Sequence, residues 1–369
     1  MITKYSDYEF SSHQEVLESL GTRTREIAEK LPKGKKVARE QLIREVSQAY
    51  KNQELVLVLG AGVSVDYGIP NWNNLMQKLM MLTLEQQPDI ALLLSKLFSN
   101  VFMPSSVIVG RYLQHYFMND DENLAFEGEV RRILYESTNK EEDSNLMKEI
   151  AKFCIAAGKS PNLDSIISYN YDDVLETFLT KLKLDIPFRS IYGNGMSPKS
   201  GELPIYHVHG FLPEKGDLSK DNTITLGEGI YHQQFTDIYS WNNITQINKF
   251  RDKTCLFIGT SLTDPNTRRL LDIARIQKGD RGHFHYILKK EYEESDIKAE
   301  LKDLLLRNKV QLLDKPEANR ILDETARLLK DIYESFEEND CLSFGVRTIW
   351  VKDFQDYPGI LSKIKNGRV

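Results

Sequence analysis

One stretch limits the fold of this chain more than any other, the segment LVLVLGAGVSVDYGIPNW at residues 55–72. Its first five residues are all apolar, as in a central parallel strand that is covered on both faces. Gly60 and Gly62 then remove side chains where the chain must turn, so the backbone could approach a phosphate closely. The third glycine of the usual dinucleotide fingerprint would fall at Val65, so this turn belongs to a different class. The alternative is a tight strand-to-helix turn without a ligand.

Composition and charge exclude several classes of protein. The 369 residues carry a formal net charge of −6 and a sequence pI of about 5.8, so we expect no direct binding of nucleic acid. Cys154, Cys255 and Cys341 are far apart and odd in number, which favours reduced thiols. The N-terminus has no apolar signal core, and no run of about 18 apolar residues occurs. We therefore expect a cytoplasmic protein without a membrane segment.

The order of helices and strands predicts the fold class. Residues 13–53 are charged and helical, and QLIREVSQAY has one apolar face. A helix capped by Asn71 follows the glycine turn, and residues 89–158 have helical spacing throughout. Strands are expected at 165–169, 188–192, 205–208, 255–258, 285–288 and 345–351, mostly with helices between them. This alternation predicts an α/β fold with a Rossmann-like, mostly parallel sheet, helices on both faces and an inserted helical lobe.

Four segments follow from this reading. Residues 1–53 form an N-terminal helical cap, and residues 54–290 form the nucleotide-binding domain, with its helical insertion at about 89–158. Residues 291–340 are highly charged and form a helical insertion or appendage, broken at 310–313. Residues 341–369 supply the last strand and a closing helix of the main domain.

Polar residues stand at four of the expected strand ends, in GAGVS, NYD, HVHG and GTSL. Because the carboxyl ends of parallel strands meet along one edge, these groups could line a single site. Ser64, Ser261 and the glycine backbones suit phosphate and ribose hydroxyls. Asn170, Asp172 and a histidine suit chemistry at a sugar. His207 and His209 are two apart, so we expect them on one face of a strand.

These motifs and their order resemble the sirtuin-like family. The resemblance rests on GAGVS followed by GIP, on SYNYDD, on HVHG and on GTSL. The chain departs from sirtuin deacylases because it lacks cysteines for their zinc module and has Tyr169 before the asparagine. It looks more like the bacterial sirtuin-like proteins of anti-phage defence. That resemblance implies NAD as substrate, no metal, release of nicotinamide and control by assembly into a homo-oligomer or by a partner, such as an ATPase or another defence protein.

The resemblance also assigns roles to residues. Asn170 and His209 match the catalytic pair of the family, and Asp172 would orient their network or place negative charge near a cationic sugar. Asn170 would hold ribose hydroxyls or a water, and a neutral His209 would accept a proton. The residues expected to bind the dinucleotide are Gly60, Ala61, Gly62, Ser64, Asn73, Gly259, Ser261 and Asp264.

Plainer structural roles compete with these assignments. Asp172 or Asp173 could cap the helix that begins near Val174, and Asp264 could cap the helix that holds Leu270 and Leu271. Two other functions also remain open: a regulatory module that binds NAD or ADP-ribose without turnover, and an NAD-dependent ADP-ribosyltransferase or deacylase. The joint order of the motifs on strand ends favours a functional site over the plainer structural roles, and the missing zinc module argues against deacylation.

Overall fold

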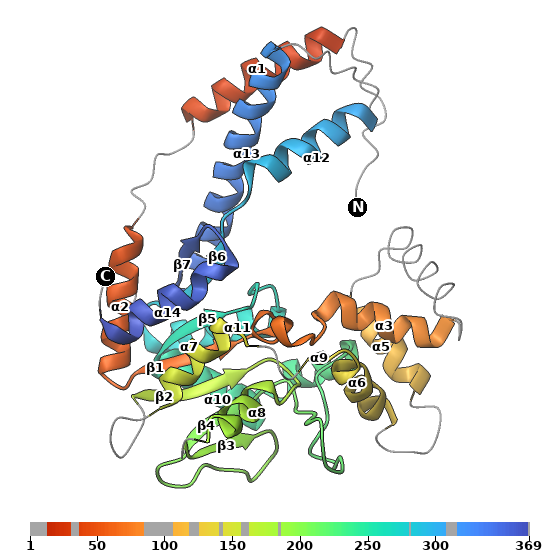
Figure 1. Cartoon of the computed structure of the whole chain (residues 1–369), viewed down its shortest axis with the longest axis vertical. Coiled ribbons are helices and arrows are strands. Elements are labelled where there is room, and N and C mark those ends of the chain that lie inside the picture. The colour runs from red at the N-terminus through yellow and green to blue at the C-terminus, as the bar shows by residue number, and fades with distance from the viewer. Residues whose placement is uncertain are drawn as a thin grey trace. The chain divides into compact units, whose positions relative to one another are not determined.

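The computed structural model describes residues 13–30, 37–84, 106–117, 125–139, 143–155, 162–183, 186–279, 282–307 and 316–367. Within these ranges, seven strands form one sheet in the order β3-β4-β2-β1-β5-β6-β7 (Figure 1). Every pairing from β3 across to β6 is parallel, which confirms the predicted Rossmann-like α/β fold. The strands are β1 (Leu55–Leu59), β2 (Leu163–Ser168), β3 (Phe188–Ile191), β4 (Leu203–His207), β5 (Thr254–Ile258), β6 (His285–Lys290) and β7 (Val346–Val351).

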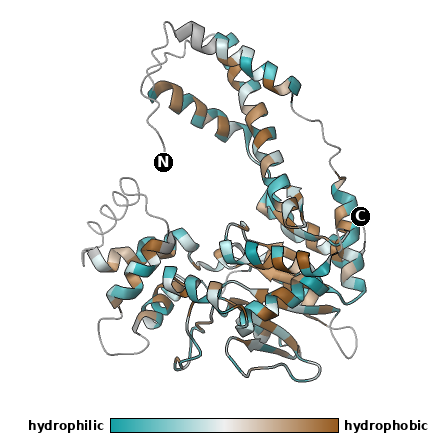
Figure 2. Ribbon diagram, turned by 180° about the vertical axis from the view of Figure 1, so that it is seen from behind, coloured by the Kyte–Doolittle hydropathy of each residue, from teal (hydrophilic) through white to brown (hydrophobic). Residues whose placement is uncertain are grey.

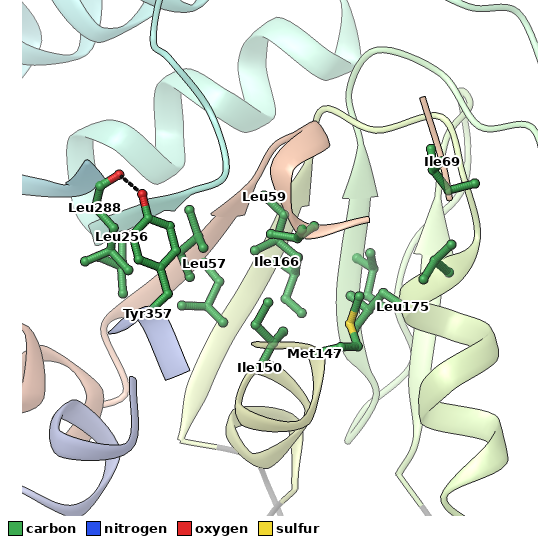
Figure 3. Close-up of a cluster of buried hydrophobic side chains, with 14 of the residues drawn as sticks. Leu57, Leu59, Ile69, Met147, Ile150, Ile166, Leu175, Leu256, Leu288 and Tyr357 are labelled. Atoms are coloured by element: carbon green, nitrogen blue, oxygen red, sulfur yellow. Dashed lines mark hydrogen bonds between the residues drawn. The ribbon is translucent and has the colours of Figure 1, made fainter. Parts of the chain in front are cut away.

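β1 is the central strand of the sheet. It pairs with β2 on one side and β5 on the other, and all five of its side chains are buried. Leu57 and Leu59 lie with Ile166 and with Ile150 of a covering helix (Figure 3). Figure 2 shows the same central strands as mainly apolar. Full burial of each such leucine contributes about 2 kcal/mol, so the strand that carries the glycine turn is firmly held.

Helices cover both faces of this sheet, because parallel strands need crossover connections. On one face Ile150 and Met147 pack beneath β1 and β2 (Figure 3). On the other face the ring of Phe250 lies 5.9 Å from that of Phe257 in β5. The helices that belong with the sheet are α2 (Arg39–Lys51), α3 (Trp72–Leu84), α5 (Ser106–Phe117), α6 (Ala125–Tyr135), α7 (Asn145–Cys154), α8 (Val174–Lys181), α9 (Glu228–Thr236), α10 (Trp241–Asp252), α11 (Pro265–Lys278) and α14 (Tyr357–Asn366).

The apolar face predicted for QLIREVSQAY is buried in α2. Leu42, Ile43, Val46 and Tyr50 all belong to the main core. α14 packs against α2, and the hydroxyl of its Tyr357 donates to the main-chain oxygen of Leu288 in β6 at 2.9 Å (Figure 3). The predicted closing helix therefore lies over the sheet beside the first covering helix.

Within the described residues, the chain between β1 and β2 contains helices joined by turns, and no strand. α3, α5 and α6 pack on one another, and Leu79, Leu113 and Phe126 from these three helices are buried in the main core. Asn71 caps α3, because its Oδ1 accepts from Asn74 N at 3.0 Å. These helices are consistent with the inserted helical lobe of the predicted fold, and its expected bounds of about 89–158 stay a prediction.

Two compact units can be distinguished by their internal contacts. The sheet unit comprises Arg39–Lys289 and Phe344–Val369, and the helical unit comprises Met1–Ala38 and Lys290–Ser343. The helical unit contains α1 (His13–Lys30), α12 (Glu294–Arg307) and α13 (Pro316–Ser343). The domain boundaries expected from the sequence stay predictions, and the break expected at 310–313 lies outside the described residues.

Within the helical unit, α1 and α12 both pack on α13. The hydroxyls of Thr24 and Thr325 share a hydrogen bond of 3.0 Å between α1 and α13. Lys298 of α12 pairs with Asp323 of α13 at 2.5 Å. Leu20 of α1 and Leu305 of α12 also pack against Ala318 and Ile321 of α13, so polar and apolar contacts together join these helices.

The three cysteines are buried thiols, and none of them forms a disulfide. This confirms the prediction that they do not form a disulfide framework. Burial raises the pKa of Cys154 to about 12, so this thiol stays protonated at neutral pH. In the described part of the chain, no helix combines the length and the apolar character needed to cross a bilayer.

Candidate active site

Four strand ends lie in one row along the carboxyl edge of the sheet. Leu59 of β1 is in register with Ser168 of β2 and with Ile258 of β5, and Ser168 is in register with His207 of β4. The segments that follow these strands therefore emerge side by side. The structure thus brings together the four polar motifs that the sequence spreads over some 200 residues.

Asn170 is the second residue after β2 and lies beside the glycine turn. The preceding residue, Tyr169, still donates its N–H to Leu59 O at 2.9 Å. The Nδ2 of Asn170 donates to Gly60 O at 3.1 Å and to Ser64 Oγ at 3.2 Å. Because both hydrogens of the amide are used within the protein, Oδ1 is the atom that Asn170 can offer to a substrate hydroxyl or to water.

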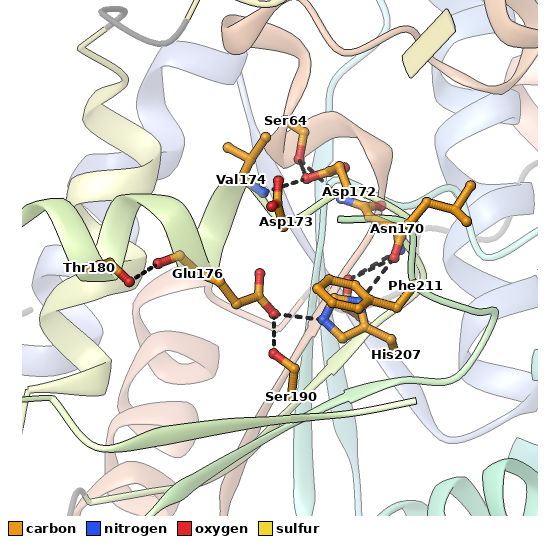
Figure 4. A network of polar contacts seen from close by, with 12 residues as sticks. Ser64, Asn170, Asp172, Asp173, Val174, Glu176, Thr180, Ser190, His207 and Phe211 are labelled. Atoms are coloured by element: carbon orange, nitrogen blue, oxygen red, sulfur yellow. Dashed lines mark hydrogen bonds and ion pairs between the residues drawn. The ribbon is translucent and has the colours of Figure 1, made fainter. Parts of the chain in front are cut away.

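Ser64 joins Asn170 to Asp172. Its Oγ donates to Asp172 Oδ1 at 3.0 Å while it accepts from Asn170 (Figure 4). Asp172 Oδ1 also accepts from Val174 N at 3.1 Å, so the carboxyl group caps α8 as well. Burial raises the pKa of Asp172 to about 6, although the hydrogen bonds from Val174 and Ser64 oppose the shift. The Ser64 hydroxyl, expected at a phosphate or ribose, is a bridge between two predicted catalytic residues.

His209 lies beyond the end of β4, in a turn. Its ring meets the ring of Tyr169 edge to face, with centroids 4.7 Å apart. Its Nε2 is 3.9 Å from Asp264 Oδ2. Burial lowers the pKa of His209, and the Asp264 carboxylate opposes the shift only in part. A neutral imidazole at pH 7 can accept a proton, as the predicted role requires.

The prediction that His207 and His209 share one face is wrong. β4 ends at His207, and Gly210 N donates to His207 O in the turn that follows, so the two-residue period of a strand does not extend to His209. His207 is 1% exposed. Its Nε2 lies 2.6 Å from Glu176 Oε1 and its Nδ1 lies 3.2 Å from Asn170 O (Figure 4). His207 is therefore inside the protein, behind Asn170.

Gly60 and Gly62 lie against Gly259, which follows β5. A Cβ on Gly60 would meet Gly259 O at 2.6 Å, and one on Gly62 would meet Gly259 Cα at 2.8 Å. The N–H groups of Gly60 and Gly62 donate to Ile258 O and Gly259 O, both at 2.9 Å. Both of these N–H groups are therefore donated within the protein, and the assignment of Gly60, Gly62 and Gly259 to the dinucleotide site stays a prediction. Because these glycines have no side chains, the turn after β1 and the turn after β5 can pack closely against each other.

The chain after Gly60 forms short turns before the next α-helix begins. These turns are η1 (Ala61–Val63) and η2 (Val65–Tyr67). Asn73 lies exposed in the first turn of α3. The assignment of Ala61 and Asn73 as dinucleotide contacts stays a prediction.

The segment after β5 combines backbone strain with polar groups. Leu262 has a φ of 61°, which is rare for a residue with a side chain. Ser261 is exposed, and its Oγ lies 2.8 Å from Thr263 Oγ1. Asp264 caps α11 by accepting from Thr267 N at 2.8 Å, as the plainer reading proposed. Its other oxygen, Oδ1, is buried and receives no hydrogen bond from the described residues, so it could accept one from a ligand hydroxyl.

Glu176 is a residue that the sequence reasoning missed. It lies in α8, is 8% exposed and accepts from Ser190 Oγ at 2.8 Å besides contacting His207. One signal could have revealed it. By helical spacing Glu176 shares a face with the apolar Leu179, and a carboxylate on a buried face calls for a charged or hydrogen-bonded partner.

The comparisons with known proteins agree with this geometry. A family model described as a SIR2-like domain matches residues 164–310, which include Asn170, His209 and Asp264. NAD(+) hydrolase ThsA of Enterococcus faecium is 22% identical over 327 residues, which are 88% of this chain and 58% of that protein. NAD(+) hydrolase ThsA of Cytobacillus dafuensis is 22% identical over 253 residues, which are 67% of this chain and 43% of that protein.

The chain therefore spans about half the length of these two relatives. The matched span contains β2 except for its first residue, all of β3, β4, β5 and β6, and three of the four polar strand ends. Residues 164–310 are thus similar to a SIR2-like domain, in agreement with the sirtuin-like order of the motifs.

Proposed function

We propose that this chain is an NAD glycohydrolase, which cleaves the bond between nicotinamide and ribose. The observation that carries the proposal is the hydrogen-bonded chain from Asn170 through Ser64 to Asp172, on the same sheet edge as His209. The names of the two relatives, both NAD(+) hydrolases, support it. In the reaction NAD⁺ and water give ADP-ribose, nicotinamide and one proton.

The chemistry needs little acid catalysis, because the nicotinamide ring is cationic in NAD⁺ and leaves as a neutral molecule. It needs stabilisation of an oxocarbenium-like ribose and a well-placed water. Asn170 Oδ1 would bind a ribose hydroxyl or that water, since the amide hydrogens already bind Gly60 and Ser64. Asp172 would hold this network and supply negative charge near the cationic sugar.

His209 would take the proton that the reaction releases. Its lowered pKa keeps the imidazole neutral at pH 7, and Asp264 lies close enough to favour the charged form as it develops. The exposed Ser261 and the buried Oδ1 of Asp264 would bind ribose or phosphate groups. Gly60, Ala61, Gly62, Ser64, Asn73 and Gly259 would form the rest of the dinucleotide site.

The physiological role that we propose is defence against phage. Unrestrained loss of NAD would be toxic, so we infer that activity is controlled by assembly into a homo-oligomer or by a partner such as an ATPase or another defence protein. The protein would act in the cytoplasm, where NAD is available. Depletion of NAD would then arrest the infected cell.

The direct test is release of nicotinamide from NAD by the purified protein, with and without candidate partners. We expect Asn170→Ala and His209→Ala each to lower kcat by about 100-fold or more, which corresponds to about 3 kcal/mol of transition-state stabilisation. Asn366→Ala and His232→Ala make the same chemical changes at exposed positions and should turn over NAD like the parent. Equal turnover by all four variants would disprove the proposed site.

The same experiment separates the competing functions. Tight binding with intact NAD after long incubation, measured by calorimetry in the presence of a partner, would favour a regulatory module. Modified protein in a mass-spectrometric search would favour transfer of ADP-ribose, and loss of acyl groups from lysine would favour deacylation.

A further inference from the structure

Both ring nitrogens of His207 face hydrogen-bond acceptors. Nδ1 lies 3.2 Å from the main-chain oxygen of Asn170, and Nε2 lies 2.6 Å from Glu176 Oε1. A carbonyl oxygen can only accept, so Nδ1 must carry a hydrogen. At the contact between Nε2 and Glu176, either an imidazolium faces a carboxylate or a neutral ring faces a protonated Glu176. In both states the pair as a whole is neutral, and both contacts are hydrogen bonds.

The surroundings of the pair exclude water. His207 is 1% exposed and Glu176 is 8% exposed. The ring of Phe211 covers the imidazole with centroids 4.2 Å apart, and Ser190 Oγ donates to Glu176 at 2.8 Å (Figure 4). A buried ion pair rarely stabilises a fold more than apolar side chains of the same volume would. Core packing alone therefore does not explain a histidine and a glutamate here.

Apolar side chains could not hold the main chain of Asn170. The sheet ladder ends one residue earlier, at Tyr169. Beyond that point the N–H of Asn170 donates to Ser168 Oγ at 3.2 Å, and its carbonyl oxygen meets His207. The peptide groups of Asn170 are thus held by side chains where strand pairing has stopped. The direction of its side chain depends on this support.

We propose that His207 and Glu176 are a positioning pair, which fixes the main chain of Asn170 so that its Oδ1 points at the reacting sugar. The inference rests on the proposed NAD glycohydrolase activity. His207 acts through Asn170 and does not touch the substrate, in contrast to His209. Glu176 holds the hydrogen bond at Nε2, which orients the ring and leaves the Nδ1 hydrogen for Asn170 O.

Two substitutions of His207 separate its contacts. The Nδ2 of asparagine stands as many bonds from Cα as Nδ1 of histidine, so His207→Asn keeps a donor for Asn170 O and gives up Glu176. The Nε2 of glutamine corresponds to histidine Nε2, so His207→Gln keeps the donor to Glu176 and gives up Asn170 O. Each variant loses one buried contact, which makes the two a matched pair.

We expect His207→Gln to lower kcat by about 10- to 100-fold, with KM changed by less than about threefold. His207→Asn should stay within about threefold of the parental kcat. Thermal unfolding should show a similar loss of stability in both variants. Equal losses of kcat in the two variants, in step with stability, would overturn the proposal and leave a purely structural pair.

Two substitutions of Glu176 test the second half of the pair. Glu176→Gln can donate an N–H to His207 Nε2 and so leaves the Nδ1 hydrogen for Asn170 O, whereas Glu176→Met cannot. Turnover should be retained in the glutamine variant and lost by about tenfold or more in the methionine variant. Equal turnover in the two would overturn the role of Glu176.

One further readout does not depend on turnover. Selective ¹⁵N labelling of asparagine would give side-chain NMR signals for Asn170, assigned by their absence in Asn170→Ser. His207→Gln should shift or broaden these signals, and His207→Asn should leave them near their parental positions. Unmoved signals in His207→Gln would overturn the positioning role. Failure of the parent to release nicotinamide would overturn the proposed function instead, so the two failures are distinguishable.

Discussion

At the scale of single residues, the amide of Asn170 can take only one orientation. Gly60 O cannot donate, so the atom beside it must be Nδ2 of Asn170. The same Nδ2 then donates to Ser64 Oγ, so the Ser64 hydroxyl must donate its own hydrogen bond to Asp172. Each hydrogen bond in this chain has a fixed direction, and it ends on an oxygen of Asp172 that has to accept.

This direction predicts the effect of Asp172→Asn on stability. The folded pKa of Asp172 is raised from 3.8 to about 6, so its proton-bound form is favoured by folding. The contribution of the Asp172 carboxyl to the free energy of unfolding is fully present below pH 3.8 and is lost as the pH rises through about 6. Asparagine accepts the same two hydrogen bonds and never ionises. We expect Asp172→Asn to gain on the order of 2 to 3 kcal/mol over the parent at pH 8 and little at pH 4.

Denaturant unfolding of parent and variant at pH 4, 6 and 8 measures this difference. Ser64→Ala serves as a control, because it removes the donor to Asp172 without removing the carboxylate. The variant should also lose NAD cleavage, since a neutral amide supplies no negative charge to a cationic sugar. A variant that is less stable than the parent at pH 8 would contradict the cost assigned to the buried carboxylate.

The residues on strand ends could be predicted from the sequence, but their partners could not. Asn170 and Asp172 follow a recognisable strand, and the parallel sheet brings them to the edge where the glycine turn lies. The bond from Ser64 to Asp172 joins residues that are 108 positions apart. No local pattern specifies such a contact, so the sequence alone predicted that Ser64 binds a phosphate or a ribose hydroxyl. Glu176 was missed for the same reason, because Glu176 lies in α8 and its partner His207 lies on β4.

At the scale of elements, the glycine turn after β1 and the turn after β5 pack backbone against backbone. Gly259 has a φ of 69°, and a Cβ there would lie 2.8 Å from Val63 N. We expect Gly259→Ala to cost about 1 to 3 kcal/mol of stability from strain alone, and more if the turns separate. The kcat of NAD cleavage should fall by more than the loss in free energy of unfolding explains, because Gly60 O orients Asn170.

Gly279 provides a matched control for this substitution. Its φ is 65°, close to that of Gly259, but a Cβ there meets nothing within 4 Å. Gly279→Ala should therefore show the conformational cost of a positive φ without the steric contact, about 1 kcal/mol. Thermal unfolding and nicotinamide release of the two variants would be compared. Equal effects would contradict a role for the close approach of the turns.

Elements were predicted well where their patterns are strong, and less well at their ends. The apolar run of β1 and the helical spacing of α2 correspond to elements in the structure. The expected strand at 205–208 begins two residues earlier and ends at His207, because the chain turns there. That difference of one residue decides whether His207 and His209 share a face, and a periodic pattern cannot resolve it.

At the scale of the whole molecule, the two compact units differ in how much apolar surface they bury. The sheet unit contains the main core, with strands such as β1 buried completely. In the helical unit, α12 has no buried residue, and a separate small cluster is centred on Ala318 and Ile321 of α13. Helices held by few apolar contacts open locally at low free energy.

Amide hydrogen exchange followed by mass spectrometry tests this difference. We expect amides of α12 to exchange by local opening, orders of magnitude faster than those of β1, which should exchange only on global unfolding. Saturating ADP-ribose, as a product of the proposed reaction, should slow exchange at residues 60–64 and 259–264 and leave α12 unchanged. Protection of α12 equal to that of β1 would contradict the local opening expected of a helix without buried residues.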